Sequence, residues 1–173
     1  MQGGSLPGTA VLLVGAAACM TDLRSRRIPN VLTFGASFAA IVFFGLSNGW
    51  AGALWSVEGW LIGCLLFLPW FLLGGMGAGD VKLLAAFGAW VGPSSAVWLA
   101  LYAGLAGGVF AIVISIGRGY LSEMFRNLWA LLMFWRVMGV QPHPELTLRT
   151  GKGPRLPYAF PITVGAVAVL WLR

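Results

Sequence analysis

Six apolar runs constrain the fold of this chain more than any other feature of its sequence. They cover about Leu6 to Met20, Val31 to Leu46, Trp55 to Leu73, Val81 to Val91, Ala96 to Ile116 and Pro157 to Leu172. A helix needs roughly 20 apolar residues to cross a hydrocarbon layer about 30 Å thick. Hydrophobic residues make up 59% of the chain and charged residues only 9%, which excludes an ordinary soluble domain. The sequence therefore predicts an all-α polytopic membrane protein of about six transmembrane helices, with residues 1–173 forming one integral-membrane domain.

The positive charges predict how these helices are oriented. No charged residue precedes Leu6, whereas Arg24, Arg26 and Arg27 follow the first run, which is the reverse of a secretory signal peptide. We therefore expect a retained first helix with its N-terminus outside. All eleven Lys and Arg residues except Arg173 then fall on the cytoplasmic side, as the positive-inside rule requires. The expected cytoplasmic loops are about 21–30, 74–82 and 118–156, the last with an interfacial helix near residues 127–135.

Two aspartates, Asp22 and Asp80, are the only ones in the chain, and each stands at the end of an apolar run. A carboxylate next to hydrocarbon is costly, by about 3 kcal/mol or more at mid-bilayer, so it lines a polar cavity or finds a partner. The predicted topology puts both carboxylates on the cytoplasmic side. We therefore expect Asp22 and Asp80 to be partners and to form the centre of the chemistry.

The apolar run that follows Asp80 is unusually short. Its eleven residues, Val81 to Val91, would form a helix of roughly 16 Å, about half the hydrocarbon thickness. Asp80 is therefore expected below the membrane surface. The glycine-rich segment before it, which includes Gly77 and Gly79, is expected to be irregular backbone that lines a cavity or is buried in protein.

Three motifs, in this order, resemble one known family. Asp22 is followed by basic residues and Ile28-Pro29-Asn30, Gly77-Ala78-Gly79-Asp80 is followed by Val81-Lys82-Leu83-Leu84, and Leu156-Pro157-Tyr158-Ala159-Phe160-Pro161 comes last. The combination resembles the type IV prepilin peptidases, which are membrane aspartic peptidases of the GxGD type. It is most similar to the short members that serve tight-adherence (Flp) pilus systems. Longer members also N-methylate the pilin and carry an extension with two Cys-x-x-Cys pairs, which this sequence does not show, so we expect proteolysis only.

The resemblance implies a substrate, a location and a mechanism. The substrate would be a prepilin, whose short basic leader is removed at the cytoplasmic face of the cell inner membrane. Asp22 and Asp80 would be the catalytic pair: the ionised carboxylate takes a proton from the attacking water, while the protonated one polarises the scissile carbonyl. No cofactor, metal or covalent intermediate is implied. The substrate's cleavage segment is expected to unwind and pair with the glycine-rich segment around Gly77 and Gly79.

Several residues near the aspartates are expected to shape the site. Pro29 fits the start of the second helix, where its missing N–H costs little, and Asn30 beside it is a polar helix-start residue. For Lys82 two interpretations stay open: a topology charge at the interface, or attraction to an acidic residue of the substrate. The glycines of the fifth run are expected to permit close helix packing, namely Gly104, Gly107 and Gly108.

Other classes of function are weighed against the peptidase. A small proton- or cation-coupled transporter could use the aspartate pair, although no paired repeat halves with matching broken helices are visible. A non-catalytic subunit of a pilus or secretion system is a further alternative. The net charge of +6 is dispersed at helix ends, which favours contact with membrane lipid and argues against nucleic acid. The sequence specifies neither the pilin nor the oligomeric state.

Overall fold

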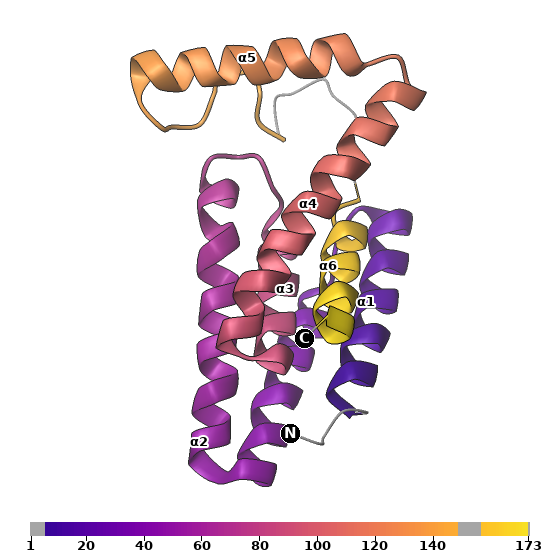
Figure 1. Cartoon of the computed structure of the whole chain (residues 1–173), viewed down its shortest axis with the longest axis vertical. Coiled ribbons are helices and arrows are strands. Elements are labelled where there is room, and N and C mark those ends of the chain that lie inside the picture. The colour runs from indigo at the N-terminus through magenta and orange to yellow at the C-terminus, as the bar shows by residue number, and fades with distance from the viewer. Residues whose placement is uncertain (1–5, 149–156, 173) are drawn as a thin grey trace.

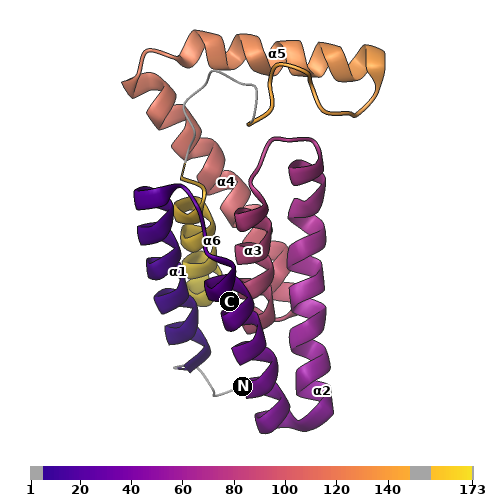
Figure 2. The same cartoon turned by 180° about the vertical axis from the view of Figure 1, so that it is seen from behind.

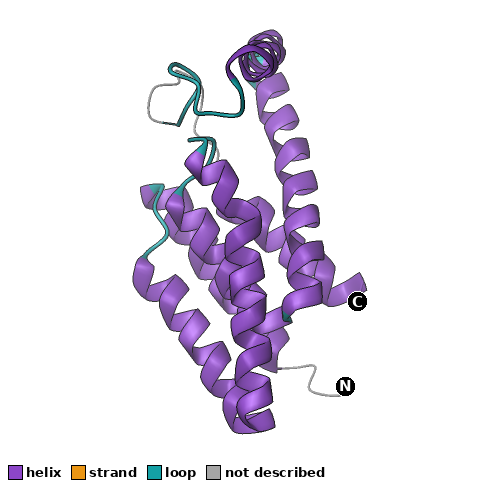
Figure 3. Cartoon of the chain, turned by 90° about the vertical axis from the view of Figure 1, so that its left-hand side faces the viewer, coloured by secondary structure: helices purple, strands orange, loops and turns teal. Residues whose placement is uncertain are grey.

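The computed structural model describes residues 6–148 and 157–172, and within these ranges it contains helices and loops but no strand (Figure 3). The helices are α1 (Leu6–Ser25), α2 (Asn30–Leu72), α3 (Ala78–Val91), α4 (Pro93–Gly117), α5 (Leu121–Met138) and α6 (Ala159–Leu172). Of these, α1, α2 and α4 are long and apolar enough to cross a membrane. The predicted class, an all-α polytopic membrane protein, is therefore confirmed.

Helix α2 is a hairpin of two limbs. Its 43 residues turn back at Gly49, where φ is 65° and ψ is −156°, a conformation that favours glycine. Figures 1 and 2 show the two limbs side by side, joined at the end of the bundle away from α5. The limbs correspond to the two predicted runs 31–46 and 55–73. The bundle therefore contains six apolar helical segments, formed by α1, the two limbs of α2, α3, α4 and α6.

Helix α3 is the centre of the bundle. Nine of its 14 residues are buried, and they include every position from 81 to 90 except Lys82. Gly59 of α2 and Gly88 of α3 lie so close that a Cβ on either would collide with the carbonyl oxygen of the other. The buried Ser56 hydroxyl donates to the Ala89 carbonyl at 2.9 Å. Because α3 is apolar on all sides, it can be enclosed by the other helices rather than face lipid.

Helix α6 lies between α1 and α4 (Figure 1), and small residues bring these three helices together. Gly15 of α1 faces the Thr163 side chain, and an added Cβ at Gly165 would lie 2.6 Å from the Ala103 backbone nitrogen of α4. With 14 residues each, α3 and α6 are about 21 Å long, less than the hydrocarbon thickness. The short helix predicted after Asp80 is thus present, and the outward faces of the longer helices expose large apolar side chains, for example Leu13, Phe38, Leu105 and Val109.

Helix α5 differs from all the others in direction and burial. It crosses one end of the bundle, and it is seen end-on in Figure 3 where the other helices are seen from the side. None of its residues is buried. A helix is thus present where residues 127–135 were expected to form an interfacial one, and it is longer, from Leu121 to Met138.

Candidate active site

Asp22 lies in the last turn of α1, and its carboxylate contacts the start of α6. The side chain is only 8% exposed. Its Oδ2 accepts a hydrogen bond from the backbone N–H of Ala159, the first residue of α6, at 3.2 Å. The first N–H groups of a helix have no partner within the helix, and they favour a negative charge. This bond joins two helices whose contacting residues are 137 positions apart.

The chain turns sharply after Asp22. Helix α1 ends at Ser25, and Arg26 has a φ of 52°, the only positive φ found on a non-glycine among the described residues. The Arg26 N–H donates to the Asp22 backbone carbonyl at 2.8 Å, which closes the helix. This turn leads the chain through Ile28 to the start of α2, beside the aspartate.

Asp80 lies in the first turn of α3 and caps that helix. Its Oδ2 accepts the backbone N–H of Gly77 at 3.1 Å. A Cβ at Gly77 would lie 3.1 Å from the same oxygen, so the absence of a side chain there leaves room for the carboxylate. The irregular segment predicted before Asp80 ends at Gly77, because Ala78 and Gly79 already belong to α3. Gly79 is packed against Ile28, with 3.2 Å from an added Cβ to the Ile28 Cβ.

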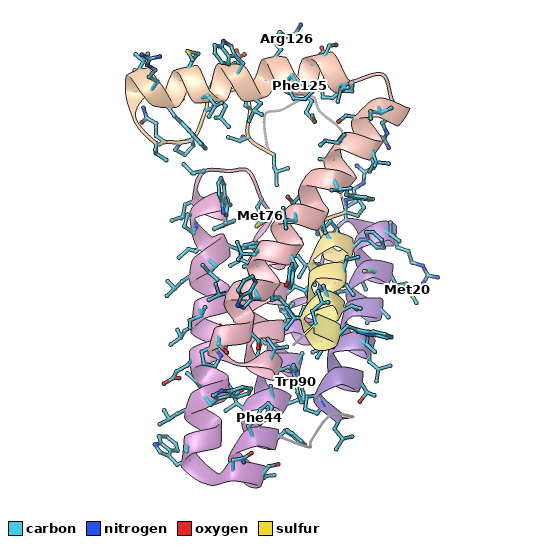
Figure 4. The ribbon with its side chains drawn as sticks, in the orientation of Figure 1. Met20, Phe44, Met76, Trp90, Phe125 and Arg126 are labelled. Carbon is cyan, nitrogen blue, oxygen red and sulfur yellow. The ribbon has the colours of Figure 1, made fainter. Side chains whose placement is uncertain are left out.

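Both aspartates line one cavity of about 700 Å³ at the end of the bundle that α5 crosses. Gly77 and Gly79 line it as well. Its wall comes from the α1–α2 connection, the α2–α3 connection, the loop after α5 and the start of α6: Asp22, Arg26, Arg27, Ile28, Phe71, Leu72, Gly74, Met76, Gly77, Ala78, Gly79, Asp80, Thr147, Leu148 and Tyr158. Met76, labelled in Figure 4, marks this end of the bundle.

The environment of Asp80 changes its acidity. Asp80 precedes the apolar run 81–91, and burial raises its pKa from 3.8 to about 7, although the hydrogen bond from Gly77 opposes the rise. The negative charge of Asp22 contributes to this rise. Asp80 can therefore hold a proton at neutral pH, as a general acid must. Two carboxylates with different protonation states are what general acid and base chemistry requires.

The remaining predicted residues lie beside the cavity and do not line it. Lys82 Nζ donates to Asn30 Oδ1 at 2.9 Å and lies 5.2 Å from the centre of the Phe34 ring. Pro29 directly precedes α2, and its carbonyl accepts the N–H groups of Leu32 and Thr33. The Asn30–Lys82 bond therefore joins the start of α2 to α3, two residues beyond Asp80.

Two parts of the cavity wall were not assigned from the sequence. Tyr158 enters the sequence analysis only as part of a motif, although a hydroxyl within an apolar motif is a signal that it lines a polar site. Thr147 and Leu148 follow α5, and the Leu148 N–H donates to the Gly74 carbonyl at 2.8 Å. Gly74 has a φ of 75°, and a Cβ there would lie 2.8 Å from the Thr147 Cγ2. Nothing in the loop's own sequence indicates this contact.

Comparison with known proteins adds to this geometry. A type 4 prepilin-like proteins leader peptide-processing enzyme from Escherichia coli O78:H11 (strain H10407 / ETEC) is 32% identical over 123 residues, which cover 62% of this chain and 44% of that protein. A prepilin leader peptidase/N-methyltransferase from Aeromonas salmonicida (strain A449) is 30% identical over 124 residues, which cover 68% of this chain and 42% of that protein. The chain therefore spans less than half the length of these curated relatives.

A family model also matches the chain. No solved structure matches the chain. The model of the type IV leader peptidase family matches residues 9–112, which include α1 from its first turn onward, both limbs of α2, all of α3 and most of α4. Asp22 and Asp80 both fall inside this range. The match extends over more than half of the sequence and confirms the resemblance carried by the motifs: the chain belongs to the type IV leader peptidase family.

Proposed function

We propose that the protein is an aspartic endopeptidase that removes the short basic leader of type IV or Flp-type prepilins. The observation that carries the proposal is that two carboxylates, which come from different helices, line one cavity. Family membership and the printed names of the relatives supply the substrate class. An aspartate pair without a metal suffices for peptide hydrolysis, because water is the nucleophile.

The mechanism assigns different tasks to the two aspartates. Asp22, held by the Ala159 N–H, acts as the base that takes a proton from the attacking water. Asp80, whose pKa is raised to about 7, carries the proton that polarises the scissile carbonyl and later reaches the leaving amine. Because the two carboxylates interact, the two pKa values seen in a pH–rate profile would describe the pair and not one aspartate each. Extended substrate backbone would lie against the segment that ends at Gly77.

We place the cavity at the cytoplasmic face of the inner membrane, with the N-terminus outside. Arg24 lies in the last turn of α1, and Arg26 and Arg27 follow the helix at this end of the bundle, which agrees with the positive-inside rule. Helix α5 supports the same placement, because four exposed apolar residues recur at helical spacing along it: Phe125, Leu128, Trp129 and Leu132. A helix of this kind that runs across a bundle fits a membrane surface, where membrane lipid covers the apolar face.

The test is coexpression with a small pilin precursor from the same genome, followed by mass spectrometry of the precursor. Wild type should remove the leader, whereas Asp22→Asn and Asp80→Asn should each lower the rate by about 10³-fold or more, because each substitution removes acid or base catalysis. Glu58→Gln is the matched control, since Glu58 is an exposed carboxylate on α2 outside the cavity. If either aspartate variant cleaves at the wild-type rate, the mechanism is wrong. If wild type leaves every candidate precursor intact, the peptidase proposal fails.

A further inference from the structure

Tyr158 lines the same cavity as the two aspartates. It lies immediately before α6 and is adjacent to Ala159, whose N–H binds Asp22. The Tyr158 backbone carbonyl accepts the N–H of Ile162, so the residue belongs to the first turn of α6. One peptide segment therefore positions both the Asp22 carboxylate and the Tyr158 ring.

The end of the Tyr158 ring occupies a space that a glycine of α4 leaves open. A Cβ added at Gly107 would lie 2.8 Å from the phenol oxygen and 3.1 Å from Cζ. Gly104 and Gly108, on the same helix, have no atom within 4 Å of such a Cβ. The packing role expected for all three glycines therefore holds only for Gly107, and was wrong for Gly104 and Gly108. The space at Gly107 accommodates the phenol.

The Tyr158 hydroxyl makes no hydrogen bond to any residue within the described ranges 6–148 and 157–172. A tyrosine hydroxyl that is partly buried usually finds a partner, so a hydroxyl without one, on a residue that lines a cavity, is a donor that a ligand can use. An ordinary tyrosine phenol loses its proton only at about pH 10. The phenol therefore keeps its proton over the neutral pH range and remains a donor.

We propose that the Tyr158 hydroxyl donates a hydrogen bond to the carbonyl oxygen of the scissile peptide, as a third catalytic residue beside Asp22 and Asp80. Negative charge develops on this oxygen when water attacks, and a prepositioned donor stabilises that charge more than the neutral carbonyl. The phenol shares its proton without transferring it, so the protons of the water pass through the aspartates alone. This inference rests on the proposed peptidase function.

The first experiment measures cleavage of a purified pilin precursor by the full chain in detergent, with kcat and KM determined separately. Tyr158→Phe should lower kcat by about 10²-fold and leave KM within about threefold, since a single oxyanion donor contributes mainly in the transition state. The pH profile of kcat/KM should keep its midpoints, because a neutral phenol adds no charge to the aspartate pair. Tyr102→Phe is the matched control, as Tyr102 lies on α4 beside Trp98 and outside the cavity.

A second experiment compares one variant that should displace the phenol with a control that should leave it in place. Gly107→Ala should displace the ring and lower kcat, whereas Gly104→Ala should keep wild-type kcat because its new methyl group meets nothing. Thermal unfolding of each variant separates this effect from loss of folded protein. The proposal is overturned if Tyr158→Phe keeps wild-type kcat, or if its loss of rate comes with shifted pH midpoints, which would indicate displaced aspartates. If wild type itself fails to cleave, both proposals are overturned; equal cleavage by wild type and Tyr158→Phe overturns only the role of Tyr158.

Discussion

The two ends of the helix bundle differ in composition and packing, although α3 runs from one end to the other. At the end near Gly49, the rings of Phe43, Phe44, Trp55 and Trp90 pack together with centroids 4.9–6.2 Å apart. Figure 4 shows Phe44 and Trp90 at this end. At the other end, two carboxylates, several glycines and backbone groups surround a cavity of about 700 Å³. We infer that the aromatic end contributes stability and that the aspartate end gives up stability for chemistry.

The largest effect on stability is expected at the aromatic end, for Gly92→Ala. Gly92 has φ 82° and ψ 175°, a region reserved almost entirely for glycine, and a Cβ there would collide with the Trp55 ring. Backbone strain of about 1–3 kcal/mol and overpacking of about 1–3 kcal/mol should both lower the free energy of unfolding.

Gly139 offers a matched control for the Trp55 contact. It has φ 82° and ψ 174°, but a Cβ there would have no atom within 4 Å. Gly139→Ala should therefore show the backbone strain alone. Thermal unfolding in detergent compares the two variants, and equal losses would mean that the Trp55 contact contributes nothing.

The next effect concerns Asp80, whose replacement should raise the free energy of unfolding at high pH, whereas Gly92→Ala should lower it. Its pKa is about 7 in the folded protein and 3.8 for an ordinary aspartate, so the folded state binds the proton more tightly. The free energy of unfolding should therefore fall as pH rises from about 4 to about 7. The other ionisable groups that line the cavity are the same in wild type and in Asp80→Asn, so they do not account for a difference between the two proteins: Asp22, Arg26, Arg27 and Tyr158. Asp80→Asn should be inactive, yet more stable than wild type at pH 8 by about 2 kcal/mol.

Unfolding of wild type and Asp80→Asn at pH 5 and pH 8 tests this prediction. The difference should shrink at pH 5, where Asp80 is protonated in the folded wild type. The exposed Glu58→Gln variant, measured in the same way, is the matched control. An Asp80→Asn protein that is less stable than wild type at pH 8 would mean that the aspartate end gives up no stability.

A smaller effect, on activity, is expected for Gly77→Ala. The new methyl group would lie 3.1 Å from Asp80 Oδ2, tighter than most contacts, so the carboxylate must move by a few tenths of an ångström. We expect kcat to fall about tenfold, because small displacements of catalytic groups are costly. Gly75→Ala is the control, since its methyl group would lie 3.6 Å from the Trp70 carbonyl. A Gly77→Ala enzyme with full kcat would show that the space beside Asp80 is dispensable.

The smallest effect is expected for the Asn30–Lys82 hydrogen bond, which is exposed. Asn30→Ala and Lys82→Met should each lower the free energy of unfolding by about 0.5–1.5 kcal/mol, and the double variant should lose no more than one of them. Kinetics separates the two interpretations of Lys82. If Lys82 only holds α2 and α3 together, KM should be similar in both single variants. If Lys82 attracts an acidic residue of the substrate, KM should rise in Lys82→Met alone.

Sequence patterns were sufficient where one segment determined the outcome. The apolar runs predicted the helical segments, and the eleven residues after Asp80 predicted a short helix, which is present as α3. Patterns were insufficient where distant segments meet. Neither the Asp22–Ala159 bond nor the Gly107–Tyr158 contact follows from spacing, because each depends on how α6 packs against other helices. Gly104 and Gly108 look identical to Gly107 in the sequence, and only the packing of α4 distinguishes them.

The bond between Asp22 and Ala159 has a consequence for the order of assembly. The carboxylate belongs to the first described helix and its donor to the last, 137 residues later. A chain that emerges from the ribosome N-terminus first must therefore insert its earlier apolar segments before this donor exists. Asp22 and Asp80 can enter the bilayer early, but the pocket around them is completed only when α6 arrives. Under the proposed function, peptide hydrolysis would therefore begin only after α6 has been synthesised.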